Sequence, residues 1–304
     1  MMMKNKKYGF LLVLSLLLAV LLVGGCSTNT QNVAQPTQEL KVLRVGAIPS
    51  EDSEKVREAY KPLVSYLEKK LGLKVELFVA TDYAGVVEAM RSGKLDIAYF
   101  GPFSYVLAAD KANAEAFAVE NKKGSGTSYR SIIVADPKTG INSIEDLKGH
   151  TFAFVDPAST SGNLIPRSFL KSKGINPEQD FKSVIYAGGH DADELAVKNH
   201  KVDAAADADV NYSKMKGAGI ISDTDVKVIF TSDPIPNSPW AWRKDLPDDL
   251  KEKIKAAFLN MAQDDPTDFA AQGKGLESYV EAKDATYNVI RDTAKILNLD
   301  LAKQ

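Results

Sequence analysis

The sequence has little of several residue types that build functional sites. Its 304 residues include one cysteine and three histidines, so no disulfide can form within the chain. His150, His190 and His200 lack nearby partners at metal-ligand spacing, and the sequence predicts neither a metal centre nor a cofactor. The formal net charge is −2, from 38 basic and 40 acidic residues. This near balance offers no basic field to attract nucleic acid, so any anion must be bound locally.

The N-terminus has the features of a targeting segment. Early lysines precede an uncharged apolar run over residues 8–23, and "VGGCS" follows, with Val23 three places before Cys26. This pattern resembles the bacterial lipoprotein signal, in which the cysteine is diacylated and becomes the mature N-terminus. The resemblance implies that residues 1–25 are a removed signal peptide and that lipid on Cys26 anchors an extracytoplasmic protein to the membrane. An uncleaved transmembrane helix with an incidental cysteine is the alternative.

The next segment, residues 26–39, is polar and is predicted to be a flexible tether. From about Leu40 strands and helices alternate, which favours an α/β fold with mostly parallel sheets. Ligands on such sheets bind at the carboxyl ends of strands. We expect strands at residues 42–49, 74–80, 95–101, 131–136, 151–156, 183–189, 202–210 and 226–232, and helices at 54–72, 82–93, 161–173 and 192–200. Near the C-terminus, residues 247–262, 276–282 and 285–298 have helical, amphipathic patterns.

Two short segments repeat the same order of residue types. "RSGKLDIAYFGP", residues 91–102, and "KNHKVDAAADAD", residues 198–209, each place lysine, an aliphatic residue and aspartate before a run of small and apolar residues. This echo predicts two similar α/β lobes, each with a strand end directed at a shared site.

The segment "VDPASTSGNLIP" carries three consecutive hydroxyl residues, Ser159, Thr160 and Ser161, between an expected strand and an expected helix. If the helix begins at Ser161, its free backbone N–H groups and the positive end of its dipole face whatever lies before it. Together with three hydroxyl donors, they form a site for a tetrahedral oxyanion without lysine or arginine. The alternative is that Ser159 or Ser161 is only a helix N-cap.

Six stretches of the sequence carry a resemblance to a known family: "LRVGAIPSED", "GKLDIAYFGPFSY", "SYRSIIVA", "IEDLKGHTFAFVDPASTSGNLIP", "GGHDA" and "IPNSPWAWRKDLP". Together they resemble the phosphonate/phosphite/phosphate-type substrate-binding proteins of ABC importers. The resemblance implies a two-lobed periplasmic-binding-protein fold, type II-like, with the ligand in the interlobe cleft and no enzymatic activity. It divides the chain into lobe 1, residues 40–135 and 236–304, and lobe 2, residues 136–235.

The same resemblance assigns ligand contacts to single residues. Tyr83 and Tyr129 match positions where the family offers tyrosine to the ligand, although either could be a half-buried core residue. His190 matches a histidine that contacts the anion, although a lone histidine is also common at surfaces and in polar cores. Tyr99, Gly101 and Pro102 lie at the end of the third expected strand, where a backbone donor could reach the ligand.

Acidic residues bear on selectivity. Asp207 and Asp209 follow a strand where the family often carries a carboxylate near its ligand, and we favour Asp209. A carboxylate facing an oxyanion requires a proton between them, so it favours ligands that keep a hydroxyl and rejects sulfate. Where aminoalkylphosphonate binders tend to carry an acid, this chain has Ser238. The expected ligand is therefore phosphite, phosphate or a small alkylphosphonate such as methylphosphonate.

Three functions are compared. The favoured one is a monomeric, lipid-anchored binding protein that delivers a phosphorus oxyanion to an ABC permease. A sensory binding protein of the same fold, presenting its bound anion to a membrane receptor, is the alternative. A serine hydrolase using Ser159 or Ser161 with His190 is disfavoured, because the chain has no "GxSxG" elbow.

Overall fold

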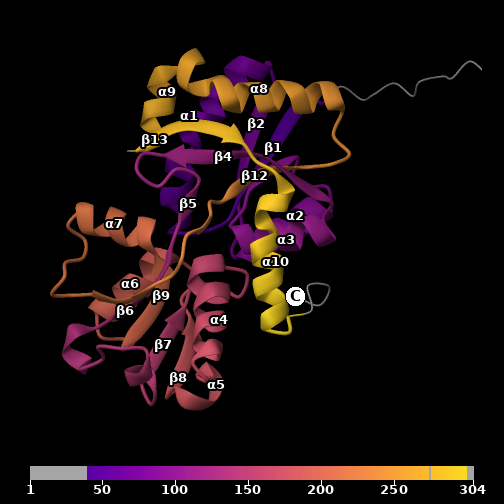
Figure 1. Ribbon diagram of the computed structural model, residues 1–304. Helices are drawn as coiled ribbons and strands as arrows, with labels where there is room; N and C mark the ends of the chain where they lie inside the picture. The colour runs from indigo at the N-terminus through magenta and orange to yellow at the C-terminus, as the bar shows by residue number, and fades with distance from the viewer. Residues whose placement is uncertain (1–39, 274, 300–304) are drawn as a thin grey trace, which may run out of the picture. The chain divides into compact units, whose positions relative to one another are not determined.

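The computed structural model describes residues 40–273 and 275–299, which form two lobes, each built around one sheet (Figure 1). The predicted signal peptide, Cys26 and the tether lie outside these residues. No helix in the described ranges is long and apolar enough to span a membrane.

Lobe 1 contains a six-stranded mixed sheet in the order β13-β4-β12-β3-β1-β2. Strand β1 pairs in parallel with β2 and β3, while β12 and β13 pair antiparallel with their neighbours. The strands are β1 (Val42–Ala47), β2 (Lys74–Val79), β3 (Ile97–Tyr99), β4 (Ala114–Lys122), β12 (Pro239–Arg243) and β13 (Leu276–Glu281). The helices are α1 (Ser53–Leu71), α2 (Tyr83–Arg91), α3 (Pro102–Lys111), α8 (Asp248–Asp264), α9 (Pro266–Ala271) and α10 (Asn288–Ile296).

Lobe 2 contains a five-stranded mixed sheet in the order β10-β6-β9-β7-β8. Here β7 pairs in parallel with β8 and β9, and β6 pairs antiparallel with β9 and β10. The strands are β6 (Ser131–Ala135), β7 (Thr151–Phe154), β8 (Ser183–Tyr186), β9 (Ala204–Ala208) and β10 (Lys227–Thr231). The helices are α4 (Ile165–Ser172), α5 (Pro177–Asp180), α6 (His190–Lys198) and α7 (Asp209–Gly217), and a π-helical turn, η3 (Thr160–Leu164), precedes α4.

The two sheets show that the sequence echo is structural. Asp96 and Asp203 stand just before β3 and β9, and each carboxylate accepts the backbone N–H of a residue on the parallel neighbour strand, Arg44 or Thr151, at 2.8 Å. Both sheets then continue with an antiparallel strand beside the echoed strand, β12 in lobe 1 and β6 in lobe 2. The expectation of two similar lobes is therefore confirmed.

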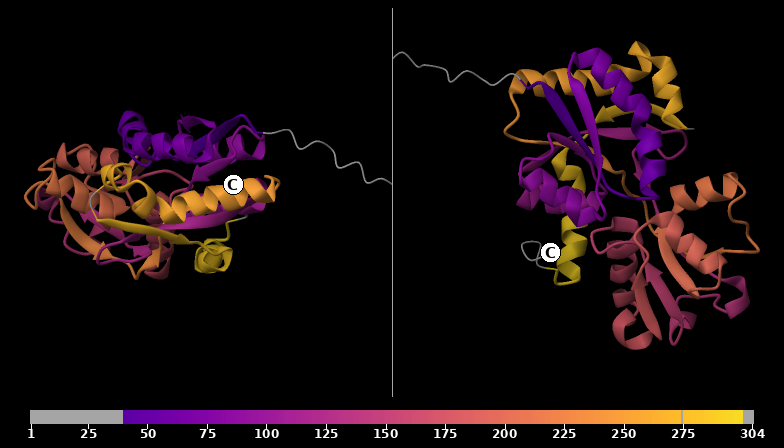
Figure 2. Two further views of the ribbon diagram at one scale, coloured as in Figure 1. Left: turned by 90° about the horizontal axis from the view of Figure 1, so that it is seen from above. Right: turned by 180° about the vertical axis from the view of Figure 1, so that it is seen from behind.

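A two-stranded antiparallel ribbon connects the lobes. It pairs β5 (Ser128–Tyr129) with β11 (Ile235–Pro236), and these strands lie where the chain leaves lobe 1 and where it returns (Figures 1 and 2). The predicted boundary after residue 135 needs correction, because β6 pairs within the sheet of lobe 2. Sheet membership divides the chain before Ser131, at the ribbon.

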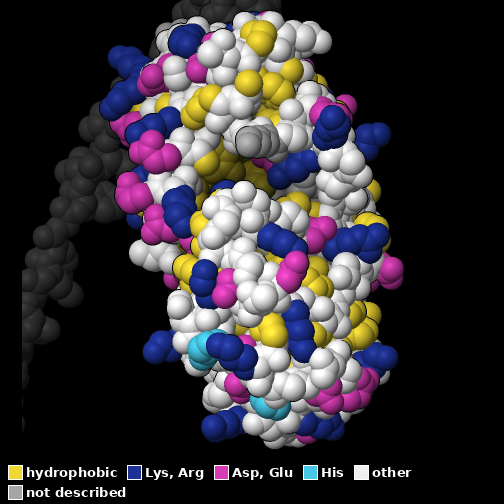
Figure 3. Space-filling model, turned by 90° about the vertical axis from the view of Figure 1, so that its left-hand side faces the viewer, with side chains coloured by type: hydrophobic (Ala, Val, Ile, Leu, Met, Phe, Trp, Pro, Cys, Tyr) yellow, Lys and Arg dark blue, Asp and Glu magenta, His cyan; other side chains and the backbone are white. Residues whose placement is uncertain are grey.

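Two apolar layers flank each sheet. In lobe 1, Trp240 and Phe258 belong to the layer under α1 and α8, and Phe103 belongs to the layer under α2 and α3. One predicted helix is wrong, because residues 276–281 form the edge strand β13. Its Tyr279 is buried and ring-packed on Phe258, so burial against the sheet outweighs the helical pattern of this short segment. The visible face in Figure 3 carries basic and acidic side chains intermixed, as the small net charge predicts.

Candidate functional site

The predicted hydroxyl loop follows β7 and leads into α4. Ser159, Thr160 and Ser161 are all buried, and the π-helical turn begins at Thr160. Ser159 is the N-cap, since its Oγ accepts the Gly162 N–H at 3.1 Å. The cap is therefore Ser159, and the turn begins one residue earlier than the predicted start at Ser161.

Close backbone packing fixes the shape of this loop. Val155 donates its N–H to the Gly162 carbonyl oxygen at 3.0 Å. A Cβ on Gly162 would lie 2.2 Å from a methyl carbon of Val155, so only glycine fits there. The Ser131 hydroxyl donates to the Ser161 carbonyl oxygen at 2.7 Å and ties the loop to β6. The loop is thus held from both sides before any ligand is considered.

Thr160 reaches across to lobe 1. Its Oγ1 accepts the Phe103 N–H of α3 at 2.8 Å. Gly101 is the N-cap of α3 and Pro102 is its first residue, and a Cβ on Gly101 would lie 3.7 Å from Thr160 Oγ1. The structure therefore brings Gly101 and Pro102 beside Thr160, as the resemblance implies.

The predicted tyrosines surround the same loop. Burial raises the pKa of Tyr83 well above its usual value, and a hydrogen bond with Ser159 opposes that shift. Burial also raises the pKa of Tyr129 to about 12, against hydrogen bonds with Ser161 and Thr160. Both phenols stay protonated at neutral pH, so each can donate a hydrogen bond to an anion.

Tyr99 has a different environment. Its ring packs against Tyr60 and Trp240 at centroid distances of 5.7 and 5.4 Å. Burial raises its pKa well above the usual value, and a hydrogen bond with Ser238 opposes the shift. Tyr99 is thus partly buried against the aromatic core of lobe 1, its hydroxyl group meets Ser238, and the phenols of Tyr83 and Tyr129 are close enough to affect its pKa.

His190 begins α6 and is buried. Its backbone N–H donates to the Ser50 carbonyl oxygen of lobe 1 at 2.9 Å. Its Nδ1 lies 2.5 Å from Asp207 Oδ1, and Asp207 is fully buried on β9. Because Asp207 occupies Nδ1, the ring nitrogen left for a ligand is Nε2.

Asp209 was predicted to be the carboxylate that faces the ligand, but its side chain accepts a backbone hydrogen bond. It is the first residue of α7, and its Oδ1 accepts the Arg130 N–H at 3.0 Å. Its charge contributes to the raised pKa of the adjacent Tyr129, after burial. Of the two aspartates, Asp207 is the one that contacts the predicted site residue His190.

Helix N-termini supply positive potential around the loop. Those of α2, α3 and α6 lie at Tyr83, Gly101 and His190, and each belongs to a helix of nine or ten residues. The positive ends of these helix dipoles favour an anion. None of the ten predicted ligand-binding residues is a lysine or an arginine. The arrangement is therefore suited to bind an oxyanion through hydroxyl groups and backbone donors.

Sequence reasoning missed the residues that join the two lobes here. Asp156 accepts the Tyr83 N–H at 3.3 Å and the Ala158 N–H at 2.7 Å. Ser50 and Phe103 contribute only backbone groups, which leave no signal in residue type. Asp156 could have been found from its place directly after a strand, in "FVDPA".

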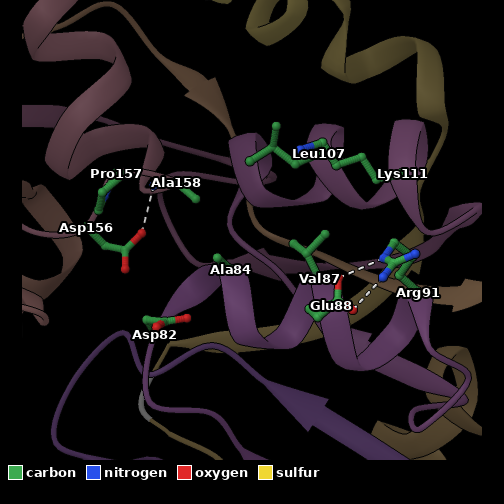
Figure 4. A pocket seen from close by; sticks show the side chains of 10 residues that line it. All are labelled: Asp82, Ala84, Val87, Glu88, Arg91, Leu107, Lys111, Asp156, Pro157 and Ala158. Atoms are coloured by element: carbon green, nitrogen blue, oxygen red, sulfur yellow. Dashed lines mark hydrogen bonds and ion pairs between the residues drawn. The ribbon is translucent and has the colours of Figure 1, made fainter. Parts of the chain in front are cut away.

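A cavity of about 630 Å³ lies nearby, between α2, α3 and residues 156–158 (Figure 4). None of the ten predicted ligand-binding residues lines it. Its charged groups include Glu88 and Arg91, which pair with each other. The hydroxyl loop, and not this cavity, is therefore the candidate anion site.

The sequence and the fold are similar to those of several known proteins. The family described as "ABC transporter, phosphonate, periplasmic substrate-binding protein" matches residues 45–287. The phosphonates-binding periplasmic protein of Escherichia coli K12 is 36% identical over 231 residues, which cover 75% of this chain and 68% of that protein. The phosphate-import protein PhnD of Mycolicibacterium smegmatis is 36% identical over 253 residues, covering 80% and 79%. A binding protein of a phosphonate ABC transporter from Pseudomonas aeruginosa has a TM-score of 0.79 at 28% identity, with 88% and 90% covered.

Proposed function

The chain belongs to the family of phosphonate-type periplasmic substrate-binding proteins of ABC transporters, and from this premise we propose that it captures phosphite, phosphate or a small alkylphosphonate. Family membership confirms that it is the binding component of an importer and not a hydrolase. The permease of that importer is its partner. The observation that carries the proposal is the convergence of the hydroxyl loop with the phenols of Tyr83 and Tyr129.

Ser238 supports a small ligand without an ammonium group. Its hydroxyl group hydrogen-bonds with that of Tyr99. Because residue 238 is a serine, it supplies no carboxylate to pair with a cation. An ammonium group there would lose a charge-assisted hydrogen bond, worth about 1.5–3 kcal/mol. We therefore expect weaker binding of 2-aminoethylphosphonate than of methylphosphonate.

Thermal unfolding with a panel of anions tests this choice. A ligand that binds only the folded protein raises the Tm as its concentration rises above its Kd. We expect shifts with phosphite, phosphate or methylphosphonate that exceed the shift with 2-aminoethylphosphonate. The largest shift with 2-aminoethylphosphonate would contradict the proposed ligand class.

The proposal includes a lipid anchor on Cys26, supported by the signal-like sequence before it. Cys26→Ser should release the protein into the soluble fraction of cells and end its labelling with a fatty-acid probe. Continued labelling of Cys26→Ser would contradict the anchor.

A sensory role with the same pocket remains the alternative to import. Transport of the bound anion, measured in cells with and without the permease, separates these two functions.

A further inference from the structure

Three carboxyl groups are buried together behind His190. Asp193 and Glu194 lie on α6 and Asp207 lies on β9, and all three side chains are fully buried. None of the four carboxyl oxygens of Asp193 and Glu194 has a hydrogen-bond partner within the described residues. Asp207 contacts His190 and, at 3.4 Å, the Asn211 amide of α7. Burying a charge without a partner is costly, so these carboxyl groups favour their protonated, neutral forms.

The acids at the rim of this cluster differ, because each has a lysine from the other lobe. Glu51 of lobe 1 pairs with Lys214 of α7 at 2.6 Å. Asp191 of α6 pairs with Lys55 of α1 at 3.0 Å. Within the described residues, no lysine or arginine is paired with the three inner acids. Among the described side chains, His190 and Asn211 are the polar groups that contact Asp207 in this cluster.

The protonation states follow from this burial. Burial raises the pKa values of Asp193 and Glu194, and the neighbouring Asp207 raises them further. Both groups are therefore neutral at pH 7. Burial raises the pKa of Asp207 as well, to about 7, while its neighbours Glu194, Ala208 and Asn211 lower it, so Asp207 is the first of the three acids to ionise. Burial lowers the pKa of His190 to about 4, against Glu51, Glu194 and Asp191.

A neutral His190 beside this carboxylate has one favoured tautomer. The Nδ1–H group donates to Asp207 at 2.5 Å, which leaves Nε2 as a hydrogen-bond acceptor. Two acceptors, Nε2 and an anion oxygen, repel unless a proton lies between them. A ligand with a P–OH group supplies that proton: hydrogen phosphate keeps one, and phosphite and methylphosphonate keep one in their monoanionic forms. Sulfate has none at neutral pH, so its binding requires one proton from solvent, which converts His190 to the imidazolium form.

On the basis of the proposed function, we propose that Asp207 acts through His190 as the residue that makes anion capture depend on one proton, and thereby selects oxyanions that keep a hydroxyl group over sulfate. Asp207 is a positioning residue, because it sets the tautomer of His190 and does not itself touch the ligand. Asp193 and Glu194, neutral and buried beside it, confine the single negative charge to Asp207.

Sulfate is the appropriate probe because it does not titrate near neutral pH. If the parent protein binds sulfate, we expect its affinity to rise about tenfold for each unit by which the pH falls between pH 8 and pH 6. Otherwise, we expect no sulfate binding anywhere in this pH range. In Asp207→Asn, the ring is free to present Nε2–H. That variant should bind sulfate with a nearly flat pH profile and lose most of the preference for phosphite over sulfate.

A second histidine–aspartate pair in lobe 2 provides the matched control. His200 Nδ1 lies 2.5 Å from Asp136 Oδ2, on a half-exposed histidine. Asp136→Asn should leave both the phosphite affinity and the preference over sulfate as in the parent. Circular dichroism of all three proteins verifies that they are folded.

Each outcome bears on one of the two proposals. The inference is overturned if the parent binds sulfate within about threefold of phosphite at pH 7.5, or if Asp207→Asn discriminates as the parent does. An equal loss of affinity for both anions in Asp207→Asn would show a purely structural role and also overturn it. If the parent binds none of phosphite, phosphate and methylphosphonate, the proposed function fails, and the inference fails with it.

Discussion

At the scale of single residues, the Thr160 hydroxyl has the most direct role in the account. Its oxygen accepts a backbone N–H from lobe 1 and its hydroxyl group lies beside the Tyr129 phenol. Removing it takes away a hydrogen bond to a buried, charged ligand, worth roughly 1.5–3 kcal/mol. Thr160→Ala should therefore weaken anion binding by about tenfold to a hundredfold in Kd, measured by calorimetric titration.

Thr160→Ser is the matched control, because it keeps the hydroxyl and removes only a methyl group. It should bind close to the parent value. Equal affinity of Thr160→Ala and the parent would remove this residue from the site. The family resemblance of the sequence points to this residue and to Tyr83, Tyr129 and His190, and the structure places both tyrosines beside the hydroxyl loop. Sequence reasoning gave Asp209 priority over Asp207, since the direction of two side chains at a strand end depends on register.

Glu194 gives a second prediction at this scale, concerning pH. Its folded-state pKa is raised by burial, so above its unfolded pKa, about 4.3, the folded state binds more protons than the unfolded state. The stability contribution therefore falls as pH rises. Glu194→Gln mimics the protonated acid and should gain stability relative to the parent between pH 5 and pH 8 in chemical unfolding. Exposed Glu277→Gln should show no such trend, and parallel pH profiles for Glu194→Gln and the parent would contradict the burial argument.

At the scale of elements, the turn between β7 and α4 depends on Gly162. A Cβ there would overlap the Val155 side chain, so Gly162→Ala must displace the turn and with it the hydroxyl groups. We expect a lower Tm together with loss of anion binding. Gly217→Ala, in α7 with no heavy atom within 4 Å of the new Cβ, should leave both nearly unchanged or raise the Tm slightly. Equal effects of the two substitutions would contradict this packing.

Helices and strands were largely predictable where a hydrophobic periodicity ends at a glycine or proline. Helix α1 ends at Leu71, and its C-cap Gly72 lies in the left-handed region at φ 66°, as the spacing and the glycine predict. Residues 276–281 were wrongly predicted as a helix. They form a six-residue edge strand with one buried tyrosine, so their apolar and polar residues alternate too little to indicate a strand. Strands β4 and β12 were not predicted, since both are buried runs whose pairing is set by distant parts of the chain.

At the scale of the whole described region, ligand binding should change the separation of the lobes. The lobes already touch through Lys55–Asp191 and Lys214–Glu51, and the ribbon of β5 and β11 is the natural hinge. We expect a saturating anion to reduce the radius of gyration in small-angle scattering. A radius that is the same with and without ligand would contradict closure.

The central claim is that this chain binds a phosphorus oxyanion at the hydroxyl loop. The most direct test is calorimetric titration of the protein from Cys26 onward, without lipid, with phosphite, phosphate and methylphosphonate, and with sulfate for comparison. The account predicts saturable binding of one anion per chain for at least one phosphorus oxyanion, tighter than sulfate at pH 7.5. Absence of heat and of competition for all three would contradict it.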